Sequence, residues 1–357
     1  MIPHYFAGAT NGAVRNNIGA ATLHSQGDRA RLSDEDKIHS PEVGIKKIGR
    51  GRMKLGVSAN FPWFGPPITE LAKTIEALGF ESMWTGEHNI IPVDIANPVK
   101  HGVKLPDNYK HMPHLFVSFA AAAVATKTLI LGMDVCLITQ RNPLILAKEA
   151  ATLDRISGGR LILGVGYGWI EEESEIMGVP FKQRVRKSTE CVQALKTLWT
   201  EETPSFSGEF ISFPPVYSYP KPLQKPHPPI LIGSGTHNTD NSRALKRVAE
   251  IGDGWVPSFL SPAQMRDQLK ELKELCDAAG RDFEKMDISL IVPAINLGVG
   301  ERPSYFAGLQ ADPKNASELI AEYEEAGVKR LLVGLDDMTD DNAFKRLEQA
   351  AKGLGLH

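Results

Sequence analysis

Short apolar runs alternate with amphipathic stretches along the chain from Met53 onward, and this alternation limits the possible folds more than any other feature. Short runs rich in Val, Ile and Leu are typical of strands that are buried on both faces. Eight runs are predicted to be strands, at Lys54–Ser58, Ser82–Thr85, Leu129–Cys136, Leu161–Val165, Ile230–Ile232, Gly254–Pro257, Ile288–Leu297 and Arg330–Val333.

Amphipathic stretches with the helical period separate these runs. They predict helices at Ile68–Leu78, Pro143–Ile156, Ser188–Thr200, Asn241–Ile251, Pro262–Ala279 and Ala316–Ala326. Because strands in a strand–helix repeat lie parallel, eight repeats favour an α/β fold of the (β/α)8 TIM-barrel class. A doubly wound open sheet is the alternative, since the strand count comes from one sequence. Residues 53–357 are predicted to form this single domain.

Residues 1–52 differ from the rest of the chain. They carry scattered Gly, Asn, Ser and charged residues, without a sustained apolar period or the hydrophobic core of a secretory signal. We expect a disordered extension, or sequence upstream of the true start, because Met53 leads directly into a strand. A mitochondrial presequence fits less well, since Asp34, Glu35 and Asp36 are out of character for one.

Charge and cysteine usage restrict the partners. The formal net charge is −3 at pH 7 and no long basic run occurs, so nucleic acid is not an expected partner. No run of about 18 apolar residues is present, so no membrane span is expected. Cys136, Cys191 and Cys276 are widely spaced and odd in number, which argues against a disulfide framework or a zinc site. We therefore expect a cytoplasmic protein without a metal centre.

Two segments are longer than ordinary connections between strands and helices. Residues 89–114 contain many Pro, Asn and His and follow the carboxyl end of a strand, where barrel active sites lie. Residues 201–229 form a Pro-rich insertion after a helix, so part of it is expected on the opposite face. One of these two segments is expected to be a lid over the barrel mouth.

The carboxyl ends of the predicted strands restrict the chemistry. Asn60 follows the first strand, but no paired histidines for a metal-dependent hydrolase stand there. Lys54 and Lys329 precede strands, which disfavours a Schiff-base aldolase. The remaining residues are aromatic, rich in glycine and sparsely charged, which suits a flat conjugated cofactor. Trp169 and Trp255 are candidates to stack on its ring, although packing at the barrel mouth explains either one equally well.

Glycine-rich loops follow the fourth and fifth predicted strands. Gly166, Tyr167 and Gly168 lead into an acidic helix start, with a spacing that differs from the dinucleotide fingerprint. The segment 233–236 (Gly-Ser-Gly-Thr) precedes a helix with Arg243, so its amides and hydroxyls are candidates to bind a phosphate. A sharp turn in the first loop and a simple helix cap in the second are equally compatible with these residues.

Glu87 and His88 form the only acid–histidine pair at the end of a predicted strand. Histidine is the commonest general acid or base near neutral pH, and its place after a barrel strand favours a catalytic role. A structural histidine held by hydrogen bonds is the alternative. His101, His111 and His114 lack the tight spacing of metal ligands and are interpreted as loop residues.

Motifs distributed in order over residues 53–334 make the chain resemble the bacterial luciferase-like monooxygenase superfamily, and within it most the probable F420-dependent oxidoreductases. The motifs are LGFESMW at 78–84 leading to Glu87-His88, RNP at 141–143, LDRISGGR at 153–160, LGVGYGW at 163–169, YPKPLQKP at 219–226 and GDGW at 252–255. The extension before Met53 has no counterpart in this pattern.

The resemblance implies a barrel that binds a flavin, or its 5-deaza analogue F420, at the carboxyl face. In such proteins the loops after strands four and five hold the cofactor phosphate, the acid–histidine pair lies by the ring and the substrate, and a non-prolyl cis peptide occurs late in strand three, here around 133–135. The expected catalytic residues are Glu87 and His88. The expected cofactor-binding residues are Asn60, Met133, Asp134, Gly166, Tyr167, Gly168, Ser234, Gly235, Thr236 and Trp255.

Three hypotheses follow. The first is an F420-dependent oxidoreductase that moves a hydride to or from a small organic substrate, with His88 as acid, base or substrate anchor and Glu87 orienting it or bonding the ligand. The second is an FMN-dependent monooxygenase that uses O2 and reduced flavin from a partner reductase. The third is a non-catalytic flavin-binding protein. A tryptophan just beyond the histidine and an acid directly after the strand-four glycines are missing, so glucose-6-phosphate is not expected as substrate. The resemblance also implies a homodimer and a flavin or F420 reductase as partner.

Overall fold

The computed structural model describes residues 53–96, 99–100, 103–236, 239–300, 315–335, 338–340 and 342–356. The predicted extension, residues 1–52, lies outside these residues. Within the described part of the chain, no helix has the length and apolar character needed to cross a membrane.

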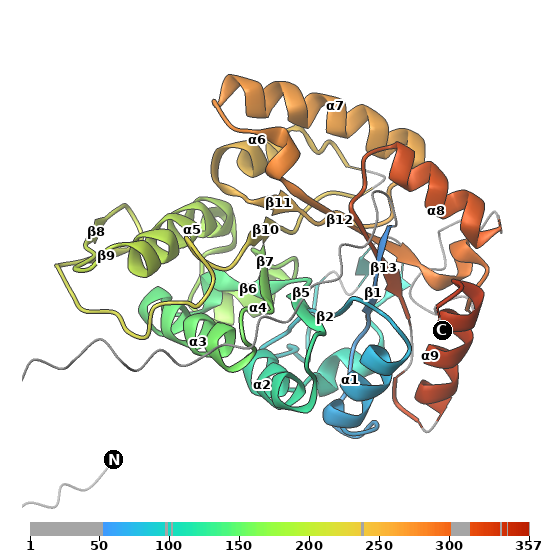
Figure 1. The fold of residues 1–357 in the computed structure, drawn as a ribbon. Helices are drawn as coiled ribbons and strands as arrows, with labels where there is room; N and C mark the ends of the chain where they lie inside the picture. Colours follow the sequence, from blue (N-terminus) through green and yellow to red (C-terminus); the bar gives the residue numbers. More distant parts are fainter. Residues whose placement is uncertain are drawn as a thin grey trace, which may run out of the picture. The chain divides into compact units, whose positions relative to one another are not determined.

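Eight parallel strands form a closed barrel (Figure 1). The strands are β1 (Lys54–Ser58), β2 (Ser82–Thr85), β5 (Ile130–Met133), β7 (Leu161–Gly166), β10 (Ile230–Ile232), β11 (Gly254–Trp255), β12 (Asp287–Pro293) and β13 (Arg330–Gly334). Two pairings close the ring: β1 lies beside β13, and β10 lies beside β7. The predicted (β/α)8 barrel is therefore confirmed, and the open doubly wound sheet is excluded.

Helices follow the strands and surround the barrel (Figure 1). They are α1 (Ile68–Ala77), α2 (Leu115–Ala125), α3 (Pro143–Ile156), α4 (Glu171–Ile176), α5 (Arg184–Thr200), α6 (Ser242–Ile251), α7 (Pro262–Ala278), α8 (Ala316–Glu325) and α9 (Asn342–Gly353). All six predicted helices are present. Sequence signals fix some of the starts: Ser261 and Gln264 form a capping box before α7, with Pro262 at the first helical position.

The core has two parts. Most buried apolar side chains lie in one large cluster that includes side chains of both the strands and the surrounding helices. A smaller cluster is formed mainly by side chains of barrel strands, namely Trp84, Ile162, Leu231, Val256 and Leu332. At the amino ends of β12 and β13, the Arg330 guanidinium donates to Asp287 at 2.7 Å and to Glu81 at 2.9 Å. This ion-pair cluster around the buried Arg330 lies at the amino end of the barrel.

The third predicted strand is interrupted, which corrects the continuous strand expected for 129–136. β5 ends at Met133, the Asp134–Val135 peptide is cis, and β6 (Cys136–Leu137) then pairs with the end of β7. The cis peptide lies within the stretch where the resemblance placed it. Beyond β6, a 3-10 turn spans Ile138–Gln140.

Two glycines of β7 make room for this interruption. A Cβ atom at Gly164 would come within 1.7 Å of the Met133 carbonyl oxygen, and one at Gly166 within 2.2 Å of Val135 Cγ2. Since no side chain tolerates such distances, the alternating glycines of this motif are explained first by packing against the neighbouring strand.

The two long segments have different structures. Residues 201–229 contain a hairpin of β8 (Phe206–Ser207) and β9 (Ser212–Phe213). Their far end is attached to α3, where the buried Asp154 carboxylate accepts hydrogen bonds from Leu223 N at 2.7 Å and Gln224 N at 2.9 Å. Residues 89–114 contain a short hairpin of β3 (Val99–Lys100) and β4 (Val103–Lys104) and a 3-10 turn, Asp107–His111.

Two further boundaries differ from the prediction. β12 ends at Pro293 and is followed by a 3-10 turn over Ala294–Leu297, where a continuous strand was expected. α5 begins at Arg184 rather than Ser188, after another 3-10 turn, Phe181–Gln183.

Candidate active site

A cavity of about 810 Å³ lies at the carboxyl ends of the barrel strands. Of the twelve residues predicted for the site, ten line this cavity: Asn60, Glu87, His88, Asp134, Gly166, Tyr167, Gly168, Ser234, Gly235 and Thr236. They are far apart in the sequence and meet because parallel strands present their carboxyl ends at one rim of the barrel.

Met133 and Trp255 do not line the cavity, which corrects their expected contact with a cofactor. Both side chains have no exposed surface and belong to the large core cluster. Val256, the residue after Trp255, lines the cavity, and successive side chains of a strand point to opposite faces. Trp255 instead supports the site from outside, because its Nε1 donates a 2.7 Å hydrogen bond to the Ser234 carbonyl.

His88 is held by a carboxylate that the sequence did not single out. Glu173 of α4 is fully buried, and its Oε2 lies 2.7 Å from His88 Nδ1. Its Oε1 accepts a 3.0 Å hydrogen bond from the backbone N–H of Asn89. An ionised carboxylate accepts only, so the proton belongs on His88 Nδ1, and Nε2 is the nitrogen left to meet a ligand. This arrangement suits a histidine that takes or gives a proton through Nε2.

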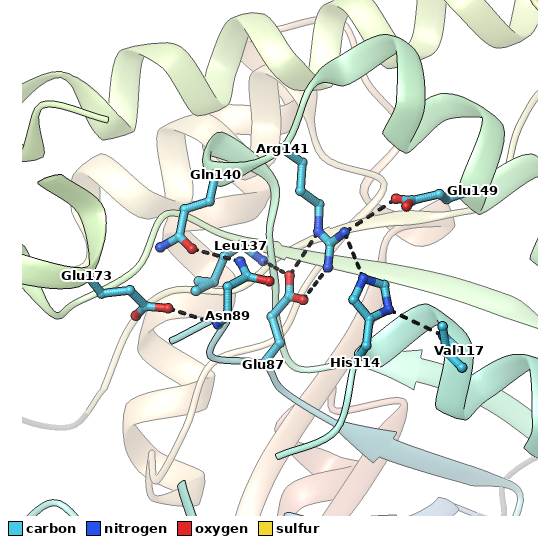
Figure 2. Close-up of polar contacts among 9 residues, drawn as sticks. All are labelled: Glu87, Asn89, His114, Val117, Leu137, Gln140, Arg141, Glu149 and Glu173. Atoms are coloured by element: carbon cyan, nitrogen blue, oxygen red, sulfur yellow. Dashed lines mark hydrogen bonds and ion pairs between the residues drawn. The ribbon is translucent and has the colours of Figure 1, made fainter. Parts of the chain in front are cut away.

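Glu87 has a different partner from the one expected. Its carboxylate contacts the Arg141 guanidinium at 2.5 Å and accepts from Leu137 N at 2.6 Å (Figure 2). Among the described residues, no hydrogen bond or ion pair joins Glu87 to His88. Arg141 also contacts Glu149 at 3.4 Å. This network connects the ends of β2 and β6 with α3. Of the two roles expected for Glu87, orienting His88 falls to Glu173 in the structure, whereas bonding the ligand stays a prediction, since Glu87 lines the cavity.

Asn89 links the same region to the turn after β6 (Figure 2). Its side-chain nitrogen donates a 2.7 Å hydrogen bond to Gln140 Oε1, while its backbone N–H is held by Glu173. The backbone that follows His88 is thus fixed from two sides, which restricts the position of the imidazole.

One region of the cavity is cationic. Arg184, Arg243 and Arg247 line it, and the guanidinium carbons of Arg184 and Arg247 each lie 5.5 Å from the centroid of the Tyr167 ring. No ion pair with a carboxylate joins any of these three arginines within the described residues. Burial also moves the pKa of Arg184 below its ordinary value, although the charges of Tyr167 and Glu171 act in the opposite direction.

Two buried polar atoms in this region have no hydrogen-bond partner, namely Ser234 Oγ and Arg247 Nε. Buried polar atoms are nearly always paired, so these two indicate a polar group of a ligand. Both are donors that suit a phosphate; Ser234 lies within the predicted loop 233–236, and Arg247 lies on α6. The residues present therefore fit an anionic cofactor group; His237 and Asn238 of this loop lie outside the described residues.

The wall near His88 is apolar and aromatic. Leu105, Tyr109 and Met112 line it from the long segment after β2, and Trp169 lines it from the end of β7. The His88 ring lies 5.5 Å from Tyr109 and 6.0 Å from Trp169, centroid to centroid. Of the two segments considered as a lid, residues 89–114 contribute to the cavity, whereas no residue of 201–229 lines it.

The sequence interpretation missed several residues of the site, among them Tyr109 and Met112 of the segment after β2 and three residues of helices. Glu173, Arg184 and Arg247 all come from helices, whereas the inventory of candidates followed strand ends. Arg247 stands four positions after Arg243, on the same face of α6, and this spacing was the signal that could have identified it.

The fold and this cavity define a TIM-barrel protein that is suited to bind an anionic, partly apolar ligand at its carboxyl face. Residues 66–297 match the family of luciferase-like monooxygenases, and the chain belongs to that family. An uncharacterised protein of Mycobacterium tuberculosis is 32% identical over 286 residues, which cover 79% of this chain and 92% of the relative.

Two further similarities name cofactors. An FMNH2-dependent dimethylsulfone monooxygenase of Pseudomonas putida is 34% identical over 191 residues, which cover 52% of this chain and 51% of that protein. The structure of an F420-dependent secondary alcohol dehydrogenase with an F420-acetone adduct superposes with a TM-score of 0.66 and 19% identity, covering 86% of this chain and 99% of that one. At this identity the superposition shows a shared fold.

Proposed function

We propose that this protein is an F420-dependent oxidoreductase that acts on a small, uncharged organic substrate with an alcohol or carbonyl oxygen. The observation that carries the proposal is the division of one cavity into a cationic region with unpaired donors and an apolar region with the His88–Glu173 pair. The first region suits the anionic part of a cofactor, and the second suits a neutral substrate.

The number of arginines supports F420 over FMN. FMN carries a single phosphate, whereas F420 carries a phosphodiester followed by several carboxylates. Arg247 is half-buried beside Tyr167, while Arg243 lies one helical turn earlier on α6 and is exposed at the cavity edge. A cofactor with an extended anionic tail uses both positions, and a single phosphate uses the inner one.

The residues of the chain would act as follows. Ser234 and Arg247 would hold the phosphate of F420, which when bound supplies the two-electron chemistry at its C5 position. His88 Nε2 would take the proton from a substrate alcohol, or give one to a carbonyl. Glu173 keeps the proton on Nδ1 and stabilises the imidazolium that forms. Tyr109, Met112 and Trp169 would exclude water from the substrate.

An anaerobic assay tests this reaction. We expect oxidised F420 to be reduced by a small secondary alcohol, and His88→Asn to lower kcat by about 10²–10⁴-fold, because that range is typical of general acid–base catalysis. Full turnover in His88→Asn, with the same substrate, would contradict the assigned role.

The FMN-dependent monooxygenase is the second candidate, and the similarity to the dimethylsulfone monooxygenase favours it. Substrate-dependent oxygen consumption with reduced FMN and a partner reductase, and without F420, would select it.

We also propose that the protein is a homodimer that associates through α2. The sequence of α2, LFVSFAAAAVA, contains no charged residue, and Val117 and Val124 on it are 69% and 74% exposed. Ile145 on the neighbouring α3 is 56% exposed. A helix that is apolar all round is normally covered. Light scattering should give twice the monomer mass, and Val124→Asp should give a monomer, whereas the matched Ile176→Asp on α4 should not.

A further inference from the structure

Asp134 is a carboxyl group on the wall of the cavity, at the point where β5 ends. Its backbone N–H donates to the Thr85 carbonyl at 3.0 Å, which attaches it to β2. Its side chain is half-buried, and Oδ2 accepts a 2.5 Å hydrogen bond from Ser58 Oγ at the end of β1. The carboxyl is therefore fixed by two neighbouring strands and faces the same space as His88.

The surroundings of Asp134 differ from those of Glu87 and Asp287, which are paired with arginines, and from those of Asp154, whose carboxylate accepts three hydrogen bonds. Glu87 has Arg141 and Asp287 has Arg330, whereas no lysine or arginine pairs with Asp134 among the described residues. A carboxyl that loses water without gaining a cation favours its neutral form. Burial accordingly raises the pKa of Asp134 to about 7, although the Ser58 hydrogen bond acts in the opposite direction.

Other ionisable groups of the cavity belong to different elements. Glu87 and His88 follow β2 and are held by Arg141 and Glu173. The remaining ones are Tyr109 of the segment after β2, Tyr167 after β7, Arg184 on α5, Asp240 just before α6, and Arg243 and Arg247 on α6. No charged group among them makes a hydrogen bond or ion pair with Asp134 within the described residues, so its protonation is governed by its burial, by Ser58 and by its own backbone N–H.

A neutral carboxyl donates a hydrogen bond, whereas its ionised form only accepts. The ring edge of an oxidised flavin or deazaflavin carries carbonyl oxygens and ring nitrogens that accept hydrogen bonds. A neutral carboxylic acid beside such an edge donates a hydrogen bond to these atoms and attracts the ring, whereas a carboxylate repels them.

We propose that Asp134, as a neutral acid positioned by Ser58, donates a hydrogen bond to the ring of the bound cofactor, and that ionisation of Asp134 weakens cofactor binding. This inference rests on the proposed function, since it assumes a flavin or deazaflavin in the cavity. It assigns to Asp134 a protonation-dependent contact, in addition to the phosphate contacts of Ser234 and Arg247.

Fluorescence titrations with F420 and with FMN between pH 6 and pH 8 test the inference. For the wild type, Kd of the cofactor that binds should rise about tenfold over this range. Asp134→Asn carries an amide that donates at every pH, so this rise should disappear. Ser58→Ala removes the bond that lowers the pKa of Asp134, so the midpoint of the rise should move to higher pH. A pH-independent wild type, or an Asp134→Asn variant with the wild-type rise, would overturn the inference.

A second measurement separates this inference from the proposed function. If neither cofactor binds at any pH, the proposed function fails, and carboxyl NMR of the 13C-aspartate-labelled apoprotein decides about Asp134. A resonance that titrates near neutral pH and is missing in Asp134→Asn would support the neutral acid. A fully ionised Asp134 at pH 6 would overturn it, even if cofactor binding is normal.

Discussion

Glu173→Gln changes the group that holds His88 while keeping its size. The carboxylate lies 2.7 Å from His88 Nδ1 and 3.0 Å from Asn89 N, and it has no exposed surface. The glutamine oxygen can still accept from Asn89, but its amide nitrogen then faces the imidazole as a donor. We expect the proton to move from Nδ1 to Nε2, which is the nitrogen that must accept the substrate proton.

The size of the effect follows from the hydrogen bonds. A hydrogen bond to a charged group contributes about 1.5–3 kcal/mol, so we expect the free energy of unfolding to fall by about that amount. A histidine with the proton on the wrong nitrogen loses its action as a base, so kcat for alcohol oxidation should fall by about 10²–10⁴-fold. KM should change less, because Glu173 does not line the cavity.

Two assays check this prediction. Steady-state kinetics with F420 and the alcohol substrate give kcat and KM, and long-range 1H–15N NMR of the imidazole reports the tautomer without any substrate. Glu172→Gln is the matched control, since it makes the same charge change on α4 but its carboxylate contacts the exposed Ala96 N–H. Unchanged kcat together with an unchanged tautomer in Glu173→Gln would refute the reasoning.

Three further predictions concern binding and stability. Arg247→Met should weaken cofactor binding by about 10–100-fold, because a hydrogen bond to a charged group is lost. Lys246→Met, on the exposed face of α6, should leave cofactor binding unchanged, and calorimetric titration measures the affinity of both variants. Asp154→Asn should lower the free energy of unfolding in urea by about 1–3 kcal/mol, because the buried carboxylate accepts several hydrogen bonds from the end of the Pro-rich insertion; an unchanged midpoint would contradict this. The folded protein holds the Asp134 proton up to about pH 7, whereas the unfolded chain releases it near pH 4, so wild-type stability should decrease with rising pH in this window relative to Asp134→Asn. If the free energies of unfolding of the wild type and of Asp134→Asn change with pH in the same way, folded Asp134 does not hold a proton in this window.

The sequence predicted the fold and most of the cavity because both depend on the same regularity. Eight buried apolar runs determine a closed parallel barrel, and a parallel barrel brings residues such as His88, Asp134 and Ser234 to one rim. The positions of these residues at the rim could be predicted without any knowledge of their side-chain contacts.

The sequence could not predict how each helix is rotated about its own axis, or which side chains of a strand point toward the cavity. From the sequence, Glu173 is one of three acidic residues that favour the start of a helix. Only the packing of α4 directs its side chain toward His88. Trp255 and Val256 are both plausible against a ligand, and the pleat of β11 places Val256 on the cavity side. Glu87 pairs with Arg141, which lies 54 positions away, and strand patterns carry no information on such a contact.

A parallel fluorescence titration of the purified protein with F420 and with FMN tests the central claim most directly. The arrangement of Arg184, Arg243 and Arg247 predicts tight binding of F420, much weaker binding of FMN, and a larger loss for F420 than for FMN in Arg243→Ala. Tighter binding of FMN, or equal losses for both cofactors in Arg243→Ala, would contradict the assignment of the cationic region to an extended anionic tail.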